Sequence, residues 1–418
     1  MIVVAYLLSF FCLILNALLF VQLGPPYNFM FLWIPQLLHH ALSPVLVVIG
    51  AAGAVLGWRY NAPLAIVAGV SGAGMSVMYI WSITRPHPGF TLAFGTEWQS
   101  KIPPQLKTHL LQSRWNIGLP QIKAPRWERN MPFWTIPVSD RELLCDLWQP
   151  NDDITPSGLA VIFLHGSAWY LSDKDFLTRP FFQQLTAQGH VVMDVAYRLC
   201  PEVDIYDMVG DVKRAVAWLK RNASEYHVDP ERIVLAGASA GGHLAMLAAY
   251  APDHAQLTPP ELANYDLSVR AVFSYYGPPD LRVAYQHMKL ARTIGLPKLE
   301  IGLPGAAEQK KNFQDAGRLD TLLGGHLHEI PEIYELASPV CHVHAGCPPT
   351  LLIQGTLDCI TPATAAQELH RRLVECDVPA INIIFPWTQH GFDLLLPQIS
   401  PPAQAALYEV ERFLALVL

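Results

Sequence analysis

A run of small residues around Ser239 constrains this chain more than any other feature. Residues 237–241 read GASAG, a G-x-S-x-G pattern between an apolar run at 233–235 and an Ala- and Leu-rich run at 243–250. The first run predicts a strand buried on both faces, and the second predicts a helix. A strand that turns so sharply into a helix needs small residues where the two cross, and it holds its serine in a strained conformation. The serine hydroxyl would then lie at a helix N-terminus, where negative charge is stabilised.

Predicted strands and helices alternate on both sides of this turn. We expect strands at 133–138, 142–148, 159–164, 191–196, 233–235, 271–275, 350–354 and 380–385, and helices at 176–188, 206–226, 243–250, 363–374 and 402–416. The first two strands flank the turn Ser139-Asp140-Arg141 and predict a hairpin. The alternation predicts an α/β fold with a mostly parallel sheet and helices on both of its faces.

Two residues after later strands provide what a serine nucleophile needs. A serine hydroxyl attacks at neutral pH only if a base takes its proton and a third group orients that base. Asp358 follows the strand at 350–354, and His390 follows the strand at 380–385. Taken alone, Asp358 could be a turn residue and His390 a hydrogen-bonded loop residue. Loops after parallel strands gather at one sheet edge, and the order Ser, Asp, His is that of the α/β-hydrolase fold. We therefore predict Ser239 as nucleophile, His390 as base and Asp358 as the residue that orients it.

Backbone N–H groups for an oxyanion hole are predicted from two places. Ala240 directly follows the nucleophile, while Ser167 and Ala168 lie in the loop after the strand at 159–164. Donors in these positions would face the oxygen that becomes charged during acyl transfer. His165, in the same loop, is predicted to hold the loop in place rather than to carry protons.

From about Phe133 onward the chain resembles α/β hydrolases of the hormone-sensitive-lipase and carboxylesterase-like group, including relatives of feruloyl esterases and kynurenine formamidase. HGSAW at 165–169, followed by Asp173-Lys174, resembles the H-G-G-G-W and G-D-K of that group. YRLCPE at 197–202 resembles its Y-R-L-A-P-E, and VDPERI at 228–233 resembles its V-D-P-x-R-I. The resemblance implies the same triad, with Gly166, Ser167 and Ala168 as the oxyanion loop. Ser and Ala replace two glycines of the group, so a backbone conformation restricted to glycine would distort the hole.

The N-terminal region has the composition of membrane helices. The first charged side chain is Arg59, and apolar runs at 1–23, 41–58 and 63–81 are long enough to cross a bilayer. Glycines in the second and third runs favour close helix packing. His39 and His40 precede the second run, where we expect them at the membrane interface rather than as metal or haem ligands.

The predicted organisation is a membrane anchor at 1–83, a linker at 84–130 and a catalytic domain at 131–418, with an insertion at 278–348 that caps the site. Four basic residues follow the third run, at 85, 101, 107 and 114, against Arg59 on the other side. The positive-inside rule therefore favours a cytoplasmic catalytic domain on a multi-pass anchor. A net charge of −7 gives no basic surface for nucleic acid. The Cys and His residues at 341–347 match no familiar zinc spacing, so we expect no metal and no cofactor.

Taken together, these patterns predict a membrane-anchored serine hydrolase that cleaves lipophilic or small acyl esters through an acyl-enzyme. The same triad could serve an amidase, a formamidase or an acyltransferase. The fold could also serve as a non-catalytic binding module. The expected partners are a small-molecule or lipid ester and the lipid bilayer, and the sequence leaves the oligomeric state open.

Overall fold

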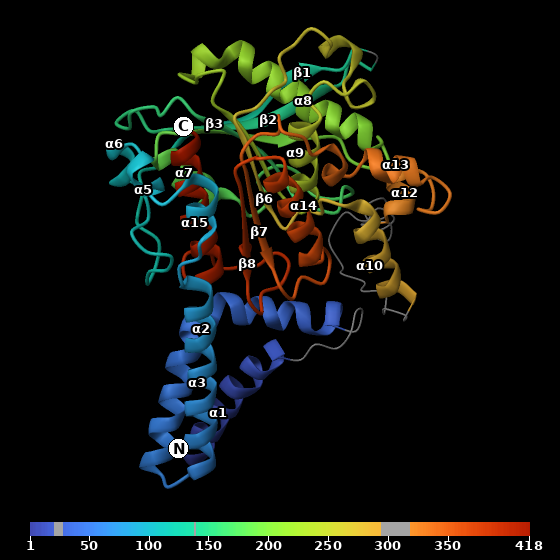
Figure 1. Ribbon diagram of the computed structural model, residues 1–418. Helices are drawn as coiled ribbons and strands as arrows, with labels where there is room; N and C mark the ends of the chain where they lie inside the picture. Colours follow the sequence, from blue (N-terminus) through green and yellow to red (C-terminus); the bar gives the residue numbers. More distant parts are fainter. Residues whose placement is uncertain (21–27, 138, 294–317) are drawn as a thin grey trace.

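In the computed structural model, three N-terminal helices form a stem below a larger α/β domain (Figure 1). The structure describes residues 1–20, 28–137, 139–293 and 318–418. The stem consists of α1 (Ile2–Ala17) with η1 (Leu18–Phe20), α2 (Asn28–Arg59) and α3 (Pro63–Thr84). By length and composition, three segments are able to cross a membrane: Ile2–Phe20, Trp33–Arg59 and Pro63–Phe94. The end of the predicted run 1–23 lies outside the described residues.

The stem helices pack through small residues, as the sequence predicts. A Cβ atom on Gly69 in α3 would lie 2.5 Å from the carbonyl oxygen of Gly50 in α2. The thiol of Cys12 in α1 donates to the carbonyl oxygen of Leu46 in α2, at 3.2 Å. Backbones can approach this closely only where side chains are small, so the predicted close packing of the second and third runs is confirmed.

Helix α2 begins well before the predicted run at 41–58. Its first part lies across the base of the α/β domain, and the rest runs alongside α3 (Figure 1). Pro35 and Pro44 lie inside the helix, and a proline bends a helix because it removes a backbone hydrogen bond. The polar residues before position 41 suggested a break, but Gln36 and His40 are buried against the protein. Protein contacts therefore extend the helix towards its N-terminus.

The α/β domain is built on one eight-stranded sheet in the order β1-β2-β4-β3-β5-β6-β7-β8. The strands are β1 (Arg126–Thr135), β2 (Glu142–Gln149), β3 (Ala160–Leu164), β4 (Val191–Ala196), β5 (Ile233–Ala238), β6 (Ala271–Tyr275), β7 (Thr350–Gly355) and β8 (Ala380–Phe385). The pairs β1/β2 and β2/β4 are antiparallel, and all remaining pairs are parallel. The predicted α/β-hydrolase fold with a mostly parallel sheet is confirmed.

Helices cover both faces of the sheet. One face packs against α8 (Ile205–Asn222), α9 (Ala240–Tyr250) and α14 (Ala363–Glu375), and the other against α7 (Arg179–Ala187) and α15 (Pro401–Val417). Single 3-10 turns are η2 (Ala223–Tyr226), η3 (Ala255–Leu257) and η4 (Pro260–Leu262). Between β6 and β7 lie α10 (Leu281–Thr293), α12 (Leu319–Leu323), α13 (Pro331–Leu336) and η5 (Pro339–His342). Part of the predicted insertion at 278–348 lies outside the described residues.

Two boundaries differ from the sequence prediction. β1 starts at Arg126 rather than at 133. The prediction missed the first residues of this edge strand because two register shifts interrupt its alternation. The segment predicted as a linker at 84–130 contains α4 (Gly89–Phe94), α5 (Trp98–Lys101) and α6 (Pro104–Lys107). It packs on α15, where the Leu111 N–H donates to the Glu411 carboxylate at 2.7 Å.

Candidate active site

The turn from β5 into α9 holds Ser239 in a strained conformation. Its backbone angles are φ 52° and ψ −119°, a region that side chains rarely adopt and that costs about 1–3 kcal/mol. A Cβ atom on Gly237 would lie 2.4 Å from the carbonyl carbon of Gly241, and one on Gly241 would lie 2.0 Å from the carbonyl oxygen of Leu164. The crossing of strand and helix therefore requires glycine at both positions. The hydroxyl is carried at the first turn of α9.

The structure brings Ser239, His390 and Asp358 into one hydrogen-bonded chain. The Ser239 Oγ lies 2.9 Å from the His390 Nε2, and the His390 Nδ1 lies 2.8 Å from the Asp358 Oδ2. Asp358 comes from the loop after β7 and His390 from the loop after β8, and each is only 6% exposed. A nucleophile, a base and an orienting carboxylate are thus within proton-transfer distance of one another.

The Asp358 carboxylate is held by four donors besides His390. Its Oδ1 accepts from the backbone N–H groups of Ile360 (2.9 Å) and Thr361 (2.7 Å). Its Oδ2 accepts from the Thr361 hydroxyl (2.9 Å) and the Gln354 Nε2 (2.7 Å). Because a carboxylate only accepts, the His390 Nδ1 must donate, and the Nε2 is left free to take the serine proton. Sequence reasoning missed Gln354 and Thr361, although both lie within four residues of Asp358.

Tyr276 forms a wall of the site that sequence reasoning also missed. Its ring centroid lies 4.3 Å from that of His390, and its hydroxyl donates to the Asp393 Oδ1 at 2.5 Å. Burial raises the pKa of the Asp393 carboxyl and the pKa of the Tyr276 hydroxyl above their usual ranges. The available signal was the place of Tyr276, which directly follows the predicted strand at 271–275.

The oxyanion loop lies directly against the nucleophile. A Cβ atom on Gly166 would lie 3.1 Å from the Ala238 carbonyl oxygen and 3.4 Å from the Ser239 Cβ. Ser167 has φ 140° and Ala168 has φ 55°, so both adopt backbone conformations that favour glycine. Ser167 and Ala168 stand where the resembled group has glycines. The loop still lies beside Ser239, but these two residues add backbone strain. Ala240, the fourth predicted donor, is the first residue of α9.

His165 holds this loop through its ring. The Nδ1 lies 2.9 Å from the carbonyl oxygen of Gly166, and the ring stacks on Tyr197 with centroids 4.4 Å apart. The Tyr197 hydroxyl donates to the carbonyl oxygen of His165 at 2.9 Å. Burial lowers the pKa of His165 to about 4, so the ring is neutral at physiological pH. These contacts fit the predicted scaffold role.

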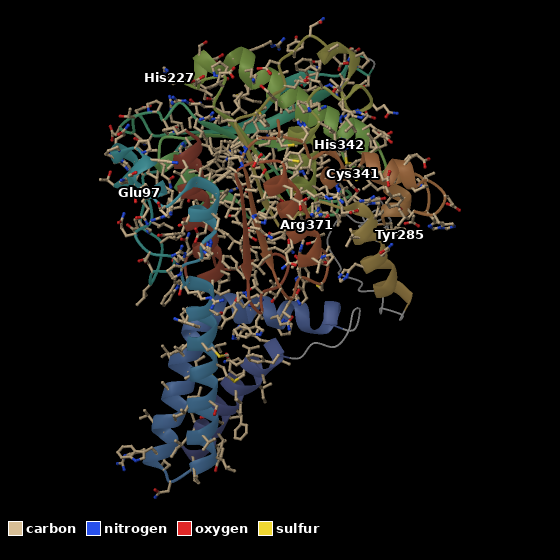
Figure 2. The ribbon with its side chains drawn as sticks, in the orientation of Figure 1. Glu97, His227, Tyr285, Cys341, His342 and Arg371 are labelled. Carbon is tan, nitrogen blue, oxygen red and sulfur yellow. The ribbon has the colours of Figure 1, made fainter. Side chains whose placement is uncertain are left out.

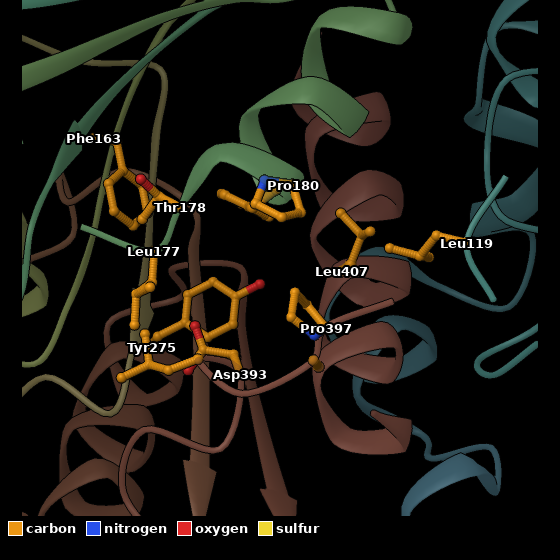
Figure 3. Close-up of a pocket in the computed structure, with 12 residues that line it drawn as sticks. Leu119, Phe163, Leu177, Thr178, Pro180, Tyr275, Asp393, Pro397 and Leu407 are labelled. Carbon is orange, nitrogen blue, oxygen red and sulfur yellow. The ribbon is translucent and has the colours of Figure 1, made fainter. Parts of the chain in front are cut away.

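A small hollow lies beside β3 and β6, the two strands that flank β5 (Figure 3). Its volume is about 40 Å³. Its lining is mostly apolar and comes from β3, β6, α7, α15, the loop after His390 and the segment before β1: Leu119, Phe163, Leu177, Thr178, Pro180, Phe181, Tyr275, Asp393, Leu394, Pro397, Ala403 and Leu407. The hollow is large enough for a small apolar group.

Other polar clusters have structural partners. The Arg198 guanidinium binds both oxygens of Asp211 at 2.8 Å, and Arg141 pairs with Glu202, so Asp211 and Glu202 belong to separate ion pairs.

Cys341 and His342 lie next to each other in the upper part of the α/β domain, away from the stem (Figure 2). Across the described ranges, no group of three His, Cys, Asp or Glu side chains is placed to hold a metal ion.

Comparison with known proteins identifies a family. The BD-FAE family model matches residues 145–373. "Probable carboxylic ester hydrolase LipM" of Mycobacterium tuberculosis is 31% identical over 272 residues, which are 65% of this chain and 57% of LipM. "Esterase LipQ" of the same organism is 26% identical over 362 residues, 82% of this chain and 80% of LipQ. The match thus spans little more than half the length of LipM. Apo Thermogutta terrifontis esterase 2 shares the fold, with a TM-score of 0.51 and 22% identity over 70% of this chain and 93% of that structure.

Proposed function

Because the chain belongs to the BD-FAE family of α/β hydrolases, we propose that it is a membrane-anchored serine esterase that cleaves carboxylic esters through an acyl-enzyme. The observation that carries this proposal is the chain of contacts from Ser239 through His390 to Asp358. The names of the Mycobacterium relatives, a carboxylic ester hydrolase and an esterase, support the same bond type.

In the proposed mechanism the Ser239 Oγ attacks the ester carbonyl carbon while the His390 Nε2 takes the hydroxyl proton. The carbonyl oxygen becomes an oxyanion and faces the backbone N–H of Ala240 and those of the 166–168 loop. His390 then passes its proton to the leaving alcohol, and the carbon–oxygen bond to that alcohol breaks. Water attacks the acyl-enzyme, gives a proton to His390 and releases the acid, after which the proton returns to Ser239.

We propose that the substrate is lipophilic and carries a small acyl group. The mostly apolar hollow, lined in part by Asp393 and Leu394 of the loop after His390, has room for a short acyl group. Leu177 at its lining and Leu396 in the loop after His390 expose about half of their surfaces, 54% and 50%. Apolar side chains at the rim favour a lipophilic alcohol or acyl group.

The stem supports the anchoring part of the proposal. Large apolar side chains on all three helices point outwards, among them Phe11, Val48, Val55, Trp58 and Val67. An exposed apolar surface of this extent is stable in hydrocarbon and unstable in water. The excess of basic residues after the third run favours a cytoplasmic α/β domain. Protease accessibility in sealed vesicles of known sidedness tests this orientation.

Fluorophosphonate labelling of the detergent-solubilised protein tests the mechanism, because the probe reacts only with an activated serine. We expect wild type to be labelled and Ser239→Ala to be unlabelled, with esterase activity reduced by about 10⁶-fold. Ser274→Ala is the matched control, because Ser274 is a buried serine near the same turn that does not contact His390. A series of p-nitrophenyl esters from acetate to laurate then measures the acyl preference. Full activity of Ser239→Ala would refute the mechanism.

A further inference from the structure

The loop that carries the catalytic histidine is hydrogen-bonded to α2 of the stem. The backbone N–H of Gln389 donates to the His40 Nε2 at 3.0 Å, and the Gln389 side-chain amide donates to the Gln36 Oε1 at 2.8 Å. One residue further, the Trp33 indole N–H donates to the carbonyl oxygen of His390 at 2.9 Å. Three side chains of α2, spaced three and four residues apart, thus face the catalytic loop from one side of the helix.

The same loop has further contacts with the stem and with the second catalytic loop. The Tyr79 hydroxyl of α3 lies 3.2 Å from the Thr388 hydroxyl, and Phe20 lies against Trp387 with ring centroids 5.5 Å apart. The Gln389 Oε1 accepts from the backbone N–H of Cys359, the residue after Asp358, at 3.3 Å. The Gln389 side chain therefore connects the loop of the base, the loop of the orienting carboxylate and the stem.

These contacts are buried, which makes them sensitive to substitution. Gln36 is 1% exposed, His40 is not exposed, and Gln389 is 2% exposed. A buried donor that loses its acceptor destabilises the fold, so the loop has a strong preference for this arrangement. Ile34 and Leu38, on the same stretch of α2, are 50% and 40% exposed and point away from the loop. The first part of α2 thus has a polar face bound to the catalytic loop and an apolar face suited to lipid.

We propose that Gln36 and His40 are positioning residues for catalysis, and that the stem is a working part of the active site as well as an anchor. The proposal rests on the esterase mechanism above. His40 holds the backbone N–H of Gln389 and Gln36 holds its side chain. Together they hold the loop in which the His390 Nε2 lies 2.9 Å from the Ser239 Oγ. If His390 moves away from Ser239, proton transfer from the serine becomes slower. The surfaces that bind the ester stay the same, so ester binding should not change.

His40→Phe tests the proposal. The new ring keeps the stacking on Tyr79, where the centroids lie 5.4 Å apart, but it offers no acceptor to the Gln389 N–H. We expect kcat and the rate of fluorophosphonate labelling to fall about 10- to 100-fold with little change in KM, since misplacement of a catalytic group acts on the chemical step. In His40→Gln the side-chain oxygen can accept the same hydrogen bond, and most of the rate should return.

His39→Phe is the matched control. His39 is also a fully buried histidine of α2, but its Nε2 lies 2.8 Å from the Asn16 Oδ1 of α1 and not at the catalytic loop. We expect it to lower the melting temperature of the full-length protein about as much as His40→Phe does, while kcat stays near wild type. Wild-type kcat in His40→Phe, or equal losses of kcat in both variants, would overturn the positioning role. Failure of wild type itself to label would instead overturn the esterase mechanism, and this inference with it.

Discussion

Asp358→Asn tests how Asp358 sets the tautomer of His390, the proposed catalytic base. The two backbone donors on the Asp358 Oδ1, from Ile360 and Thr361, cannot change into acceptors. The asparagine oxygen should therefore take the Oδ1 position, which places the amide nitrogen where the Oδ2 now faces His390. The His390 Nδ1 would then have to accept rather than donate. Its proton would move to the Nε2, which could no longer take a proton from Ser239.

The magnitude follows from this change of tautomer. The wrong tautomer in a Ser-His-Asp site lowers kcat by about 10⁴-fold, and at 1.36 kcal/mol for each factor of ten this is about 5 kcal/mol in the activation free energy. The amide nitrogen would also face the Gln354 Nε2, which now donates to the Oδ2 at 2.7 Å. Two opposed donors in a buried site should lower the free energy of unfolding by about 1–3 kcal/mol.

The assay is kcat for p-nitrophenyl acetate hydrolysis, normalised to folded protein, together with the melting temperature in detergent. Thr361→Val is the control, because it removes one hydroxyl donor from the Oδ2 and leaves the donor pattern at His390 unchanged. It should lower the melting temperature, since a hydrogen bond to a charged group is worth about 1.5–3 kcal/mol. It should lower kcat far less than Asp358→Asn does, because the His390 Nδ1 can still donate to the Oδ2. If Asp358→Asn stayed within tenfold of wild type, Asp358 would not determine the tautomer.

Two further changes address strain and pH. Ser167→Gly should relieve the strain of the φ of 140° and increase the free energy of unfolding by about 1–3 kcal/mol, which raises the melting temperature. Fluorophosphonate labelling should be at least as fast as in wild type. A lower melting temperature would contradict the strain argument. Burial raises the pKa of the Glu411 carboxyl to about 8. The folded protein therefore holds a proton that the unfolded chain releases above about pH 4.3. The free energy of unfolding should accordingly fall as the pH rises from about 5 to 8. Glu411→Gln should flatten this fall in a pH series of melting temperatures, and an unchanged slope would contradict it.

The sheet could be predicted well because its interior strands are short apolar runs that hardly depend on their surroundings. The predicted strands at 191–196, 271–275 and 380–385 coincide with β4, β6 and β8. The G-x-S-x-G turn was predictable for the same reason, since the close approach of strand and helix excludes a Cβ at Gly237 and Gly241. The start of edge strand β1 was predicted seven residues too late, because its exposed charged side chains and bulges obscure the period of two.

The supports of the candidate site could not be predicted in the same way. Tyr276 and Gln389 act through contacts between loops that follow different strands, and no spacing in the sequence indicates which loops meet. Gln354 lies at the end of β7, and the apolar pattern of that strand does not show that its side chain reaches Asp358. The first part of α2 has the same difficulty. His39 and His40 were expected at a membrane interface, because polar residues next to an apolar run normally mark the end of a span, but both are fully buried against the protein.

The polar face of α2 also limits how the stem can be oriented. A polar side chain that faces lipid is costly, so rotation of α2 that moved Gln36 and His40 away from the catalytic loop would be strongly opposed. The same rotation would bring the exposed Ile34 and Leu38 against the α/β domain and remove the hydrogen bonds to Gln389. In the proposed membrane-anchored protein, lipid on one side of α2 and the loop of His390 on the other would favour one rotational position of the helix. A change in bilayer thickness that shifts α2 should therefore also shift His390. The rate of fluorophosphonate labelling in vesicles should depend on bilayer thickness in wild type. This dependence should be weaker in His40→Phe, in which α2 no longer binds the backbone of Gln389.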